Sequence, residues 1–311
     1  MPTISSSSAD LRVVSGAHPS ASPPSQAGAQ QQAARQQTGT AQQTGAMQQA
    51  GAPKQPPPRP AGHAPWLPII LGVLFPIALI ALWQAVYTAQ IVSPLVIPRP
   101  LDVVDALIKG VGGGTWWRHI GATAQATVLA FAGGFVTAIV IGSIFAFSAL
   151  ARQTFYPYII AIQSFPKVAV APLLVVWLGY GLMPKVVIGG LLAFFPIFTN
   201  TVAGLTEIDR DETDLFRSLR ASKLDQLRFL RIPNALSYIF PALNVAAVNA
   251  LLGVIVGELV GTDAGLGYLI SQRSFLGDTA GVFGVLFLLA LIGVSMFLLL
   301  KLIERYTRFS R

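Results

Sequence analysis

The sequence predicts an all-α integral membrane protein with six transmembrane helices behind a disordered N-terminal tail. The 311 residues are 53% hydrophobic and only 11% charged, with a mean hydropathy of +0.61, whereas an average soluble domain is roughly 25% charged. The apolar residues gather in six runs, each long enough to cross a bilayer core, which takes roughly 20 helical residues. No run alternates at period two, as a membrane barrel strand would. These features exclude an ordinary soluble enzyme, and the lack of cysteine excludes a disulfide-stapled secreted domain.

The tail comprises residues 1–64 and consists mainly of Ser, Ala, Gln, Gly, Thr and Pro. Such a segment buries too little apolar surface to offset its chain entropy, so we expect it to be disordered. A solvated tail without specific function and a docking or regulatory segment both remain open. The membrane domain then occupies residues 65–311.

The six predicted spans follow the apolar runs in chain order. Their bounds are 66–88, 122–149, 155–178, 186–205, 238–260 and 282–303. The third span contains Lys167 and three prolines, and the fifth carries Glu258 near its end. Small residues recur in the second and fifth spans, where they favour close helix packing in lipid. Examples are Gly133, Gly134, Gly142 and Gly253.

The basic residues predict the orientation of these spans. If the tail is cytoplasmic, fifteen Lys and Arg residues fall on the cytoplasmic side and five on the other. The five are Arg99, Lys109, Arg118, Lys185 and Arg273. Because Lys and Arg collect on the cytoplasmic side of membrane proteins, both termini are predicted to be cytoplasmic. The net charge of +8 is therefore a topology signal, and we expect lipid and no nucleic acid among the partners.

The long cytoplasmic loop, residues 206–237, holds six bases and six acids. Its large apolar residues recur at three- to five-residue steps, which is typical of amphipathic helices. We expect two short helices, broken near Ala221 and Ser222, and we expect Pro233 to end the helical pattern, because proline cannot continue the hydrogen-bond ladder. Such a loop either lies on the membrane interface or presents its apolar stripe to a partner.

The loop resembles the EAA loop of permease subunits in bacterial ATP-binding-cassette (ABC) importers, whose signature is E-A-A, three residues, G, nine residues and I-x-L-P. Asp214, Leu215 and Phe216 stand at the E-A-A place, and Arg220 stands at the glycine. The signature ends here as Leu230-Arg231-Ile232-Pro233. The arginine is a departure, because glycine adopts positive φ or allows close approach of a backbone, whereas arginine does neither easily.

Further segments resemble the nitrate/sulfonate/taurine branch of these permeases, in order, over residues 66 to 311. They are Ile97-Pro98-Arg99-Pro100, Phe165-Pro166-Lys167-Val168-Ala169, Trp177-Leu178-Gly179-Tyr180-Gly181, Phe194-Phe195-Pro196, Glu258-Leu259, Gly265-Leu266-Gly267-Tyr268 and Leu302-Ile303-Glu304-Arg305. The resemblance implies the type I importer permease (MetI-like) fold in a bacterial inner (plasma) membrane.

The resemblance also implies the partners: a second permease copy, most simply an identical one, two cytoplasmic ABC ATPase subunits, and a periplasmic or lipid-anchored binding protein. The loop would form a coupling helix over residues 211–223 that seats in a groove of the ATPase, with Leu215 and Phe216 as apolar anchors. The chain has no G-x-x-x-x-G-K-[ST] loop. We therefore expect a transporter subunit that is not an enzyme, with no cofactor of its own and ATP bound by its partner.

The translocation path is predicted around the prolines of the third span. Pro166 and Pro172 free backbone carbonyls, which are tolerated at membrane depth only against protein or a wet cavity. The freed carbonyls therefore suggest that the segment faces a translocation path, and the alternative is a structural kink without contact to a path. The candidate path residues are Gln163, Pro166, Lys167 and Pro172. Lys167 would then attract an anion or snorkel to the surface. Glu258 either lines the path or gate or hydrogen-bonds loop backbone near Gly265.

Two other classes of function were weighed. A secondary transporter usually carries inverted repeats and several buried coupling charges, and neither is visible. An intramembrane enzyme needs polar catalytic groups that converge at depth, and only Glu258 and Lys167 are available. The histidines do not cluster, so we expect no metal. The predicted substrate is a small anion such as nitrate, a sulfonate, taurine or bicarbonate. The alternative is a vitamin-like or aromatic compound, such as a thiamine precursor, riboflavin or an aromatic acid.

Overall fold

The structure is a computed structural model that describes residues 66–93 and 95–309. The chain divides into two units, Met1–Ile70 and Leu71–Arg311. Only the start of one helix represents the first unit, so the predicted tail lies outside the described residues. Every regular element in the described part of the chain is a helix, which confirms the all-α prediction.

The elements follow one another with short connections. In order they are α2 (Leu67–Thr88), α3 (Pro100–Leu107), the π-turn η1 (Ile108–Gly112), α4 (Trp117–Phe147), α5 (Ala149–Gln163), the 3₁₀ turn η2 (Lys167–Val170), α6 (Ala171–Leu178), α7 (Leu182–Thr206), α8 (Arg210–Ser218), α9 (Lys223–Gln226), the π-turn η3 (Leu227–Arg231), α10 (Ile232–Val260), α11 (Leu266–Phe275) and α12 (Thr279–Phe309).

Five of the described helices are long and apolar enough to cross a membrane singly: α2, α4, α7, the helix that ends in α10, and α12. The third predicted span is not one straight helix. It consists of α5 followed by η2 and α6, and the two parts are bent by 79°. The bend falls at Ser164–Pro166, where proline cannot donate to the preceding turn. Five single helices and this broken pair account for the six predicted runs.

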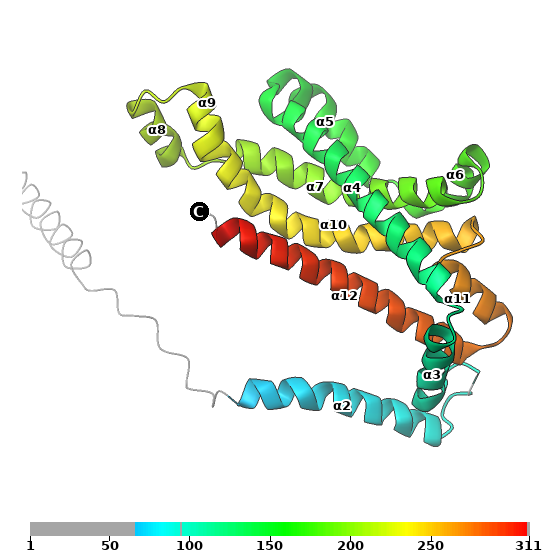
Figure 1. Cartoon of the computed structure of the whole chain (residues 1–311). Helices are drawn as coiled ribbons and strands as arrows, with labels where there is room; N and C mark the ends of the chain where they lie inside the picture. The colour runs from blue at the N-terminus through cyan, green and yellow to red at the C-terminus, as the bar shows by residue number, and fades with distance from the viewer. Residues whose placement is uncertain (1–65, 94, 310–311) are drawn as a thin grey trace, which may run out of the picture. The chain divides into compact units, whose positions relative to one another are not determined.

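Helix α7 lies at the centre of the packing, between α4 and α10 (Figure 1). A buried apolar core joins the three helices, with Ala130, Ile197, Phe198, Ala246 and Val254 among its members. Small residues permit the close approach. A Cβ added at Gly253 would lie 2.6 Å from the Cα of Gly189, and one at Gly134 would lie 2.7 Å from the carbonyl oxygen of Gly190.

The small residues named from the sequence therefore pack as predicted at Gly134, Gly142 and Gly253, each of which faces a neighbouring helix. Gly133 is different, because no atom lies within 4 Å of an added Cβ there. Adjacent residues of one helix point in different directions, so only one glycine of the pair can face α7.

The two ends of the bundle carry different elements. Helices α8 and α9 lie at one end, and α3 and α11 lie at the other, which we call the distal end (Figure 1). A second buried cluster fills the distal part with Trp116, Leu266, Leu269, Val285 and Leu289. Helix α2 contacts α12 through Trp83, whose ring centroid lies 5.6 Å from that of Phe283.

Candidate functional site

The loop that joins α7 to α10 folds as two short helices, as the sequence predicted. Asp209 caps α8, accepting from the amide of Asp211 at 3.2 Å. Ser222 and Asp225 form a reciprocal capping box on α9, with Asp225 N donating to Ser222 Oγ at 3.2 Å and Ser222 N donating to Asp225 Oδ2 at 3.1 Å. Such a box satisfies two amide donors that the first helical turn leaves free. The sequence thus fixes where each helix begins.

Helix α8 presents apolar side chains outward. No residue of this helix is buried, and Leu215 is 56% exposed. Leu219 and Leu224 continue the exposed apolar surface at 68% and 71%. Phe216 is half-buried and Leu230 is buried at 7%. Exposed leucines on a charged helix favour contact with a partner, whereas Leu230 packs within the chain.

The two helices are separated at Arg220, which adopts φ +52°. The left-handed region is costly for a residue with a side chain and is the conformation in which glycine ends helices. The backbone at this place therefore keeps the glycine geometry that the signature requires, although arginine occupies it. The guanidinium is exposed and makes no ion pair with any described residue, including the acids of its own loop.

Two expectations about this loop were wrong. The coupling helix predicted over 211–223 ends at Ser218. Pro233 does not end the helical pattern, because α9 runs through η3 into α10 as one helix over Lys223–Val260. Proline at the first turn of α10 lacks an amide donor, and the wider π-turn just before it shifts the ladder to accommodate the gap.

A groove opens where the loop meets the end of α4. Its volume is about 610 Å³, and its wall combines apolar and basic side chains. It is lined by Ala146, Phe147, Lys223, Leu224, Gln226, Leu227 and Arg231. Arg231 also donates to the carbonyl of Leu205 at 3.1 Å, which ties the start of α10 to the end of α7. The exposed Leu224 thus stands at the edge of a hollow in the surface.

Four of the predicted path residues gather at the bend between α5 and α6. Lys167 donates from Nζ to the carbonyl of Gln163 at 2.5 Å, and its Nζ lies 4.6 Å from the ring centroid of Phe195 on α7. Pro166 precedes η2 and Pro172 lies in the first turn of α6. Gln163, Pro166 and Pro172 are exposed on this chain, while Lys167 is half-buried and has no carboxylate partner among the described residues.

Glu258 lies elsewhere, and no interaction joins it to those four residues in the described chain. Its carboxylate is enclosed, with 1% of the residue exposed. It accepts from Gly267 N at 2.9 Å and from Thr123 Oγ1 at 2.9 Å. Of the two roles left open, these contacts are those of a residue that hydrogen-bonds the loop near Gly265.

The partner of Glu258 was missed from the sequence. Lys185 Nζ lies 3.3 Å from Glu258 Oε1, and only 3% of this lysine is exposed. The sequence assigns Lys185 to the non-cytoplasmic side, directly before the fourth predicted span, and in the structure it lies in the first turn of α7. Lys185 directly precedes the fourth predicted span and Glu258 lies near the end of the fifth, so both fall on the same side of the membrane, and matching opposite charges by depth would have found the pair.

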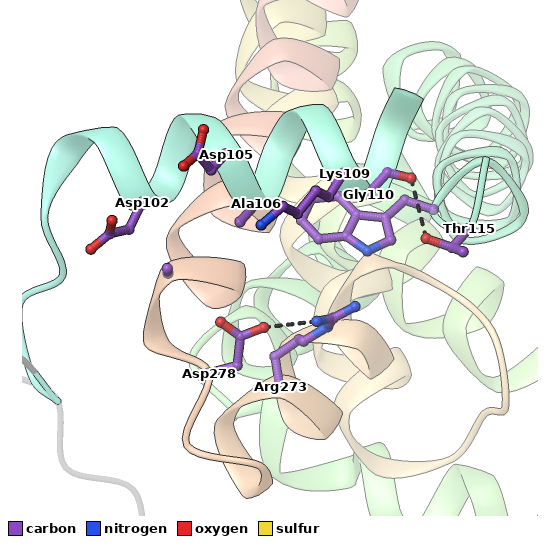
Figure 2. A pocket seen from close by; sticks show the side chains of 10 residues that line it. Asp102, Asp105, Ala106, Lys109, Gly110, Thr115, Arg273 and Asp278 are labelled. Atoms are coloured by element: carbon purple, nitrogen blue, oxygen red, sulfur yellow. Dashed lines mark hydrogen bonds and ion pairs between the residues drawn. The ribbon is translucent and has the colours of Figure 1, made fainter. Parts of the chain in front are cut away.

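The distal end carries a charged pocket of about 390 Å³ between α3, η1 and the start of α12 (Figure 2). Arg273 and Asp278 point toward each other on one wall of it, with Nη1 and Oδ2 2.7 Å apart. Asp102, Asp105 and Lys109 line the opposite helix. The indole nitrogen of Trp116 and Nε of Arg273 are buried without an acceptor. The pocket therefore offers both donors and acceptors to a polar partner.

The family model for the binding-protein-dependent transport system inner membrane component matches residues 134–309. This range covers the C-terminal part of α4 and every element from α5 to α12.

Curated relatives extend the likeness over most of the chain. The formylaminopyrimidine transport permease protein ThiX of Halalkalibacterium halodurans is 31% identical over 74% of this chain and 92% of its own length. The riboflavin transport system permease protein RibX of Chloroflexus aurantiacus is 33% identical over 77% and 87%. The putative aliphatic sulfonates transport permease protein SsuC of Bacillus subtilis is 28% identical over 75% and 85%.

A solved structure has the same fold. The MetNI methionine ABC transporter, in inward facing conformations, matches with a TM-score of 0.52 and 22% identity. The match covers 61% of this chain and 95% of the other.

Proposed function

The chain belongs to the family of binding-protein-dependent transport system inner membrane components, and from this premise we propose that it forms the translocation path of an ATP-driven importer for a small anion. The family makes the chain a transporter subunit of the inner membrane and not itself an enzyme. ATP hydrolysis is assigned to separate ATPase subunits, and substrate delivery to a binding protein.

The projecting loop of α8 and α9 carries the proposal. Its exposed Leu215 and Leu219 supply an apolar stripe on a helix that otherwise carries charge. An amphipathic helix of this kind suits a hydrophobic groove in a partner protein. The loop is continuous with both α7 and α10, so a partner that moves it acts directly on two spans. This continuity supports a coupling role for α8, and the excess of Lys and Arg on this side supports a cytoplasmic place for the loop and for both termini.

The candidate path supports pairing with a second, identical copy. The side chains of Gln163, Pro166 and Pro172 are exposed on a single chain. Helix α5, which leads to them, has no buried residue. A path must be shielded from lipid, because polar and broken backbone is tolerated at membrane depth only against protein or water. A homodimer in which two such faces meet supplies that enclosure.

Lys167 supports an anionic substrate. Its ammonium group stands at the break of the third span, and its interactions there are with a carbonyl and a ring rather than with a carboxylate. An anion that passes the break would gain a charge-assisted hydrogen bond. The relative SsuC bears the name of a transporter of aliphatic sulfonates, which are anions.

The alternative substrate is a vitamin-like aromatic compound. It draws support from the names of ThiX and RibX and from the aromatic residues beside Lys167. Phe195, whose ring lies next to the Lys167 ammonium group, is in ring contact with Phe194 at 5.2 Å between centroids, and Phe194 in turn contacts Phe198 at 5.3 Å.

The charged distal pocket is the candidate contact for the binding protein. It lies at the end of the bundle opposite α8, where substrate would arrive (Figure 1). Charged side chains of both signs line it, among them Asp102, Lys109 and Arg273. A docked partner with the complementary pattern of charge would pair with them.

Uptake by cells tests the substrate. A strain that expresses this chain together with its ATPase and binding-protein partners is given a radiolabelled aliphatic sulfonate or riboflavin. We expect sulfonate uptake, and Lys167→Met is expected to lower it by about tenfold, the effect of one lost charged hydrogen bond. Lys301→Met is the matched control, since its Nζ also lies over a phenylalanine ring, 5.9 Å from the centroid of Phe297, but on α12. Riboflavin uptake that Lys167→Met does not lower would favour the vitamin-like aromatic substrate.

A further inference from the structure

A buried polar network joins four helices at the distal end. Glu258 of α10 and Lys185 of α7 form its ion pair, with Nζ and Oε1 3.3 Å apart and side chains 0% and 4% exposed. Thr123 of α4 donates from Oγ1 to the carboxylate at 2.9 Å and accepts from Leu266 N of α11 at 2.7 Å. Gly267 N of α11 donates to Glu258 Oε2 at 2.9 Å. One carboxylate thus holds groups from three other helices.

The loop before α11 is shaped around the same carboxylate. Gly265 has φ +134°, and a Cβ at this position would lie 2.2 Å from the Glu258 carboxyl carbon. Lys185 Nζ also donates to the carbonyl of Ala264 at 3.1 Å. Gly265 N donates to His119 Nδ1 of α4 at 3.2 Å. Contacts from α4, α7 and α10 therefore hold the start of α11 in one position.

Stability alone gives little reason for charges in this place. Burying two ions costs several kcal/mol each, and replacing such pairs with apolar residues is often neutral or stabilising. Ionisable groups at membrane depth are more often functional. The ion pair instead fixes the relative positions of the helices that it joins, because each partner accepts or donates hydrogen bonds only from fixed directions.

The network lies at the end of a closely packed helix pair that begins at the coupling loop. Next to α8, a Cβ at Gly204 would lie 2.7 Å from Ala235 Cα. Farther along, Gly253 meets Gly189. At the distal end, a Cβ at Gly257 would lie 2.6 Å from the Cα of Lys185. Backbone contacts at three heights leave α7 and α10 little freedom to slide past each other, so the two move together.

We infer that Lys185 and Glu258 are positioning residues that make α11 move as one body with α7 and α10 when α8 is displaced. The pair thereby links the cytoplasmic coupling helix to the distal face on which the binding protein docks. This inference rests on the proposed function, since it takes the ATPase and the binding protein as partners at the two ends.

The first measurement needs neither partner's activity. The chain contains no cysteine, so spin labels on Val187→Cys of α7 and Phe275→Cys of α11 are the only ones present. Both positions are exposed, at 41% and 93%. Labelled chains are diluted with an excess of unlabelled chains, so that a dimer in a nanodisc carries at most one labelled copy, and the ATPase is free of reactive cysteines. Pulsed electron paramagnetic resonance is then expected to give one narrow distance distribution that is the same with and without nucleotide-bound ATPase. Lys185→Met and Glu258→Gln are expected to broaden it.

The second measurement separates positioning from folding. In the reconstituted complex, Lys185→Met is expected to lower the stimulation of ATP hydrolysis by the binding protein about two- to thirtyfold, the usual range for residues between coupled sites. Hydrolysis without the binding protein is expected to stay within about twofold of wild type, as for a residue remote from the nucleotide. The double variant K185M/E258Q removes both charges and is expected to regain thermal stability without regaining stimulation.

Arg118→Gln is the matched control. Arg118 of α4 pairs with Asp263 of the same distal loop at 2.9 Å, but the two side chains are 69% and 82% exposed. Exposed pairs contribute little, so this variant is expected to resemble wild type in both measurements. A narrow distance distribution in Lys185→Met, or full stimulation in the double variant, would overturn the inference. A wild-type chain that binds no ATPase would instead refute the proposed function, and the spin-label result would still stand.

Discussion

Substitution of Gly253 by alanine tests the close packing of α7 against α10. The added Cβ would lie 2.6 Å from the Cα and 2.8 Å from the N of Gly189. It would also lie 2.9 Å from Leu192 Cδ1, which can rotate away, whereas the Gly189 backbone cannot. Because carbon atoms pack at about 3.5–4.0 Å, the two helices must separate by roughly 1 Å.

The expected cost follows from two opposing effects. Overpacking a well-filled contact costs about 1–3 kcal/mol. Alanine favours a helix over glycine by about 1 kcal/mol, which partly offsets that cost. Gly133→Ala is the matched control, because it makes the same change inside α4 with no atom within 4 Å. The helical preference of alanine is the same in the two variants, so Gly253→Ala is expected to be less stable than Gly133→Ala by about 1–3 kcal/mol.

Reversible unfolding by sodium dodecyl sulfate, followed by the fluorescence of the five tryptophans, measures this difference. Gly133→Ala is expected to match or exceed wild type, and Gly253→Ala is expected to unfold at lower detergent. Equal stability of the two variants would refute the packing of α7 on α10 described above.

Two further predictions concern the loop between α7 and α10 and are both measured by amide hydrogen exchange. Arg220→Gly relieves the strain of the left-handed backbone at φ +52°, and the extra chain entropy of glycine offsets part of that gain. The amide of Ala221 donates to Phe216 O at 3.0 Å, and its hydrogen exchange is expected to slow by about two- to fivefold. Unchanged or faster exchange at Ala221 would mean that arginine is unstrained there. Ser222→Ala removes the capping box and about 1 kcal/mol with it, so the amide of Asp225 is expected to exchange about fivefold faster. Exchange at Asp225 that does not respond would show that the cap contributes nothing.

Length and apolar character were enough to predict the spans, because crossing a bilayer imposes both on a helix. The broken third span was only partly predictable. Pro157 lies inside α5 without a break comparable to the 79° bend near Pro166. The sequence signal is the same at both prolines, and the difference comes from the Ser164–Pro166 segment, which lies next to α7 through Lys167 and Phe195.

The loop between α7 and α10 also shows where local sequence preferences fail to predict the backbone. Pro233 was expected to stop a helix, but an inserted π-turn carries the helix past it. Arg220 was expected to resist positive φ, yet the loop imposes that conformation. In both cases the local preference is worth a few kcal/mol at most and is overridden by the helices on either side.

Lys185 shows what pattern reading misses. Hydropathy placed it in a loop, because a lysine interrupts an apolar run. Its partner is 73 positions away on another helix, and such a pairing leaves no trace in periodicity. Glu258 is recognisable as unusual from the sequence, but its partners on three other helices are visible only in the assembled structure.

Transport by a coupling-helix variant tests the central claim most directly. Phe216→Asp is compared with Tyr306→Asp, which introduces the same charge at an exposed aromatic residue of α12 at the same end of the bundle. Both chains are reconstituted into proteoliposomes with the ATPase and the binding protein, and ATP-driven uptake is measured at equal amounts of inserted permease. If α8 couples ATP hydrolysis to transport, Phe216→Asp inserts normally but supports no uptake, and Tyr306→Asp transports like wild type. Normal uptake by Phe216→Asp would contradict the coupling role of this helix.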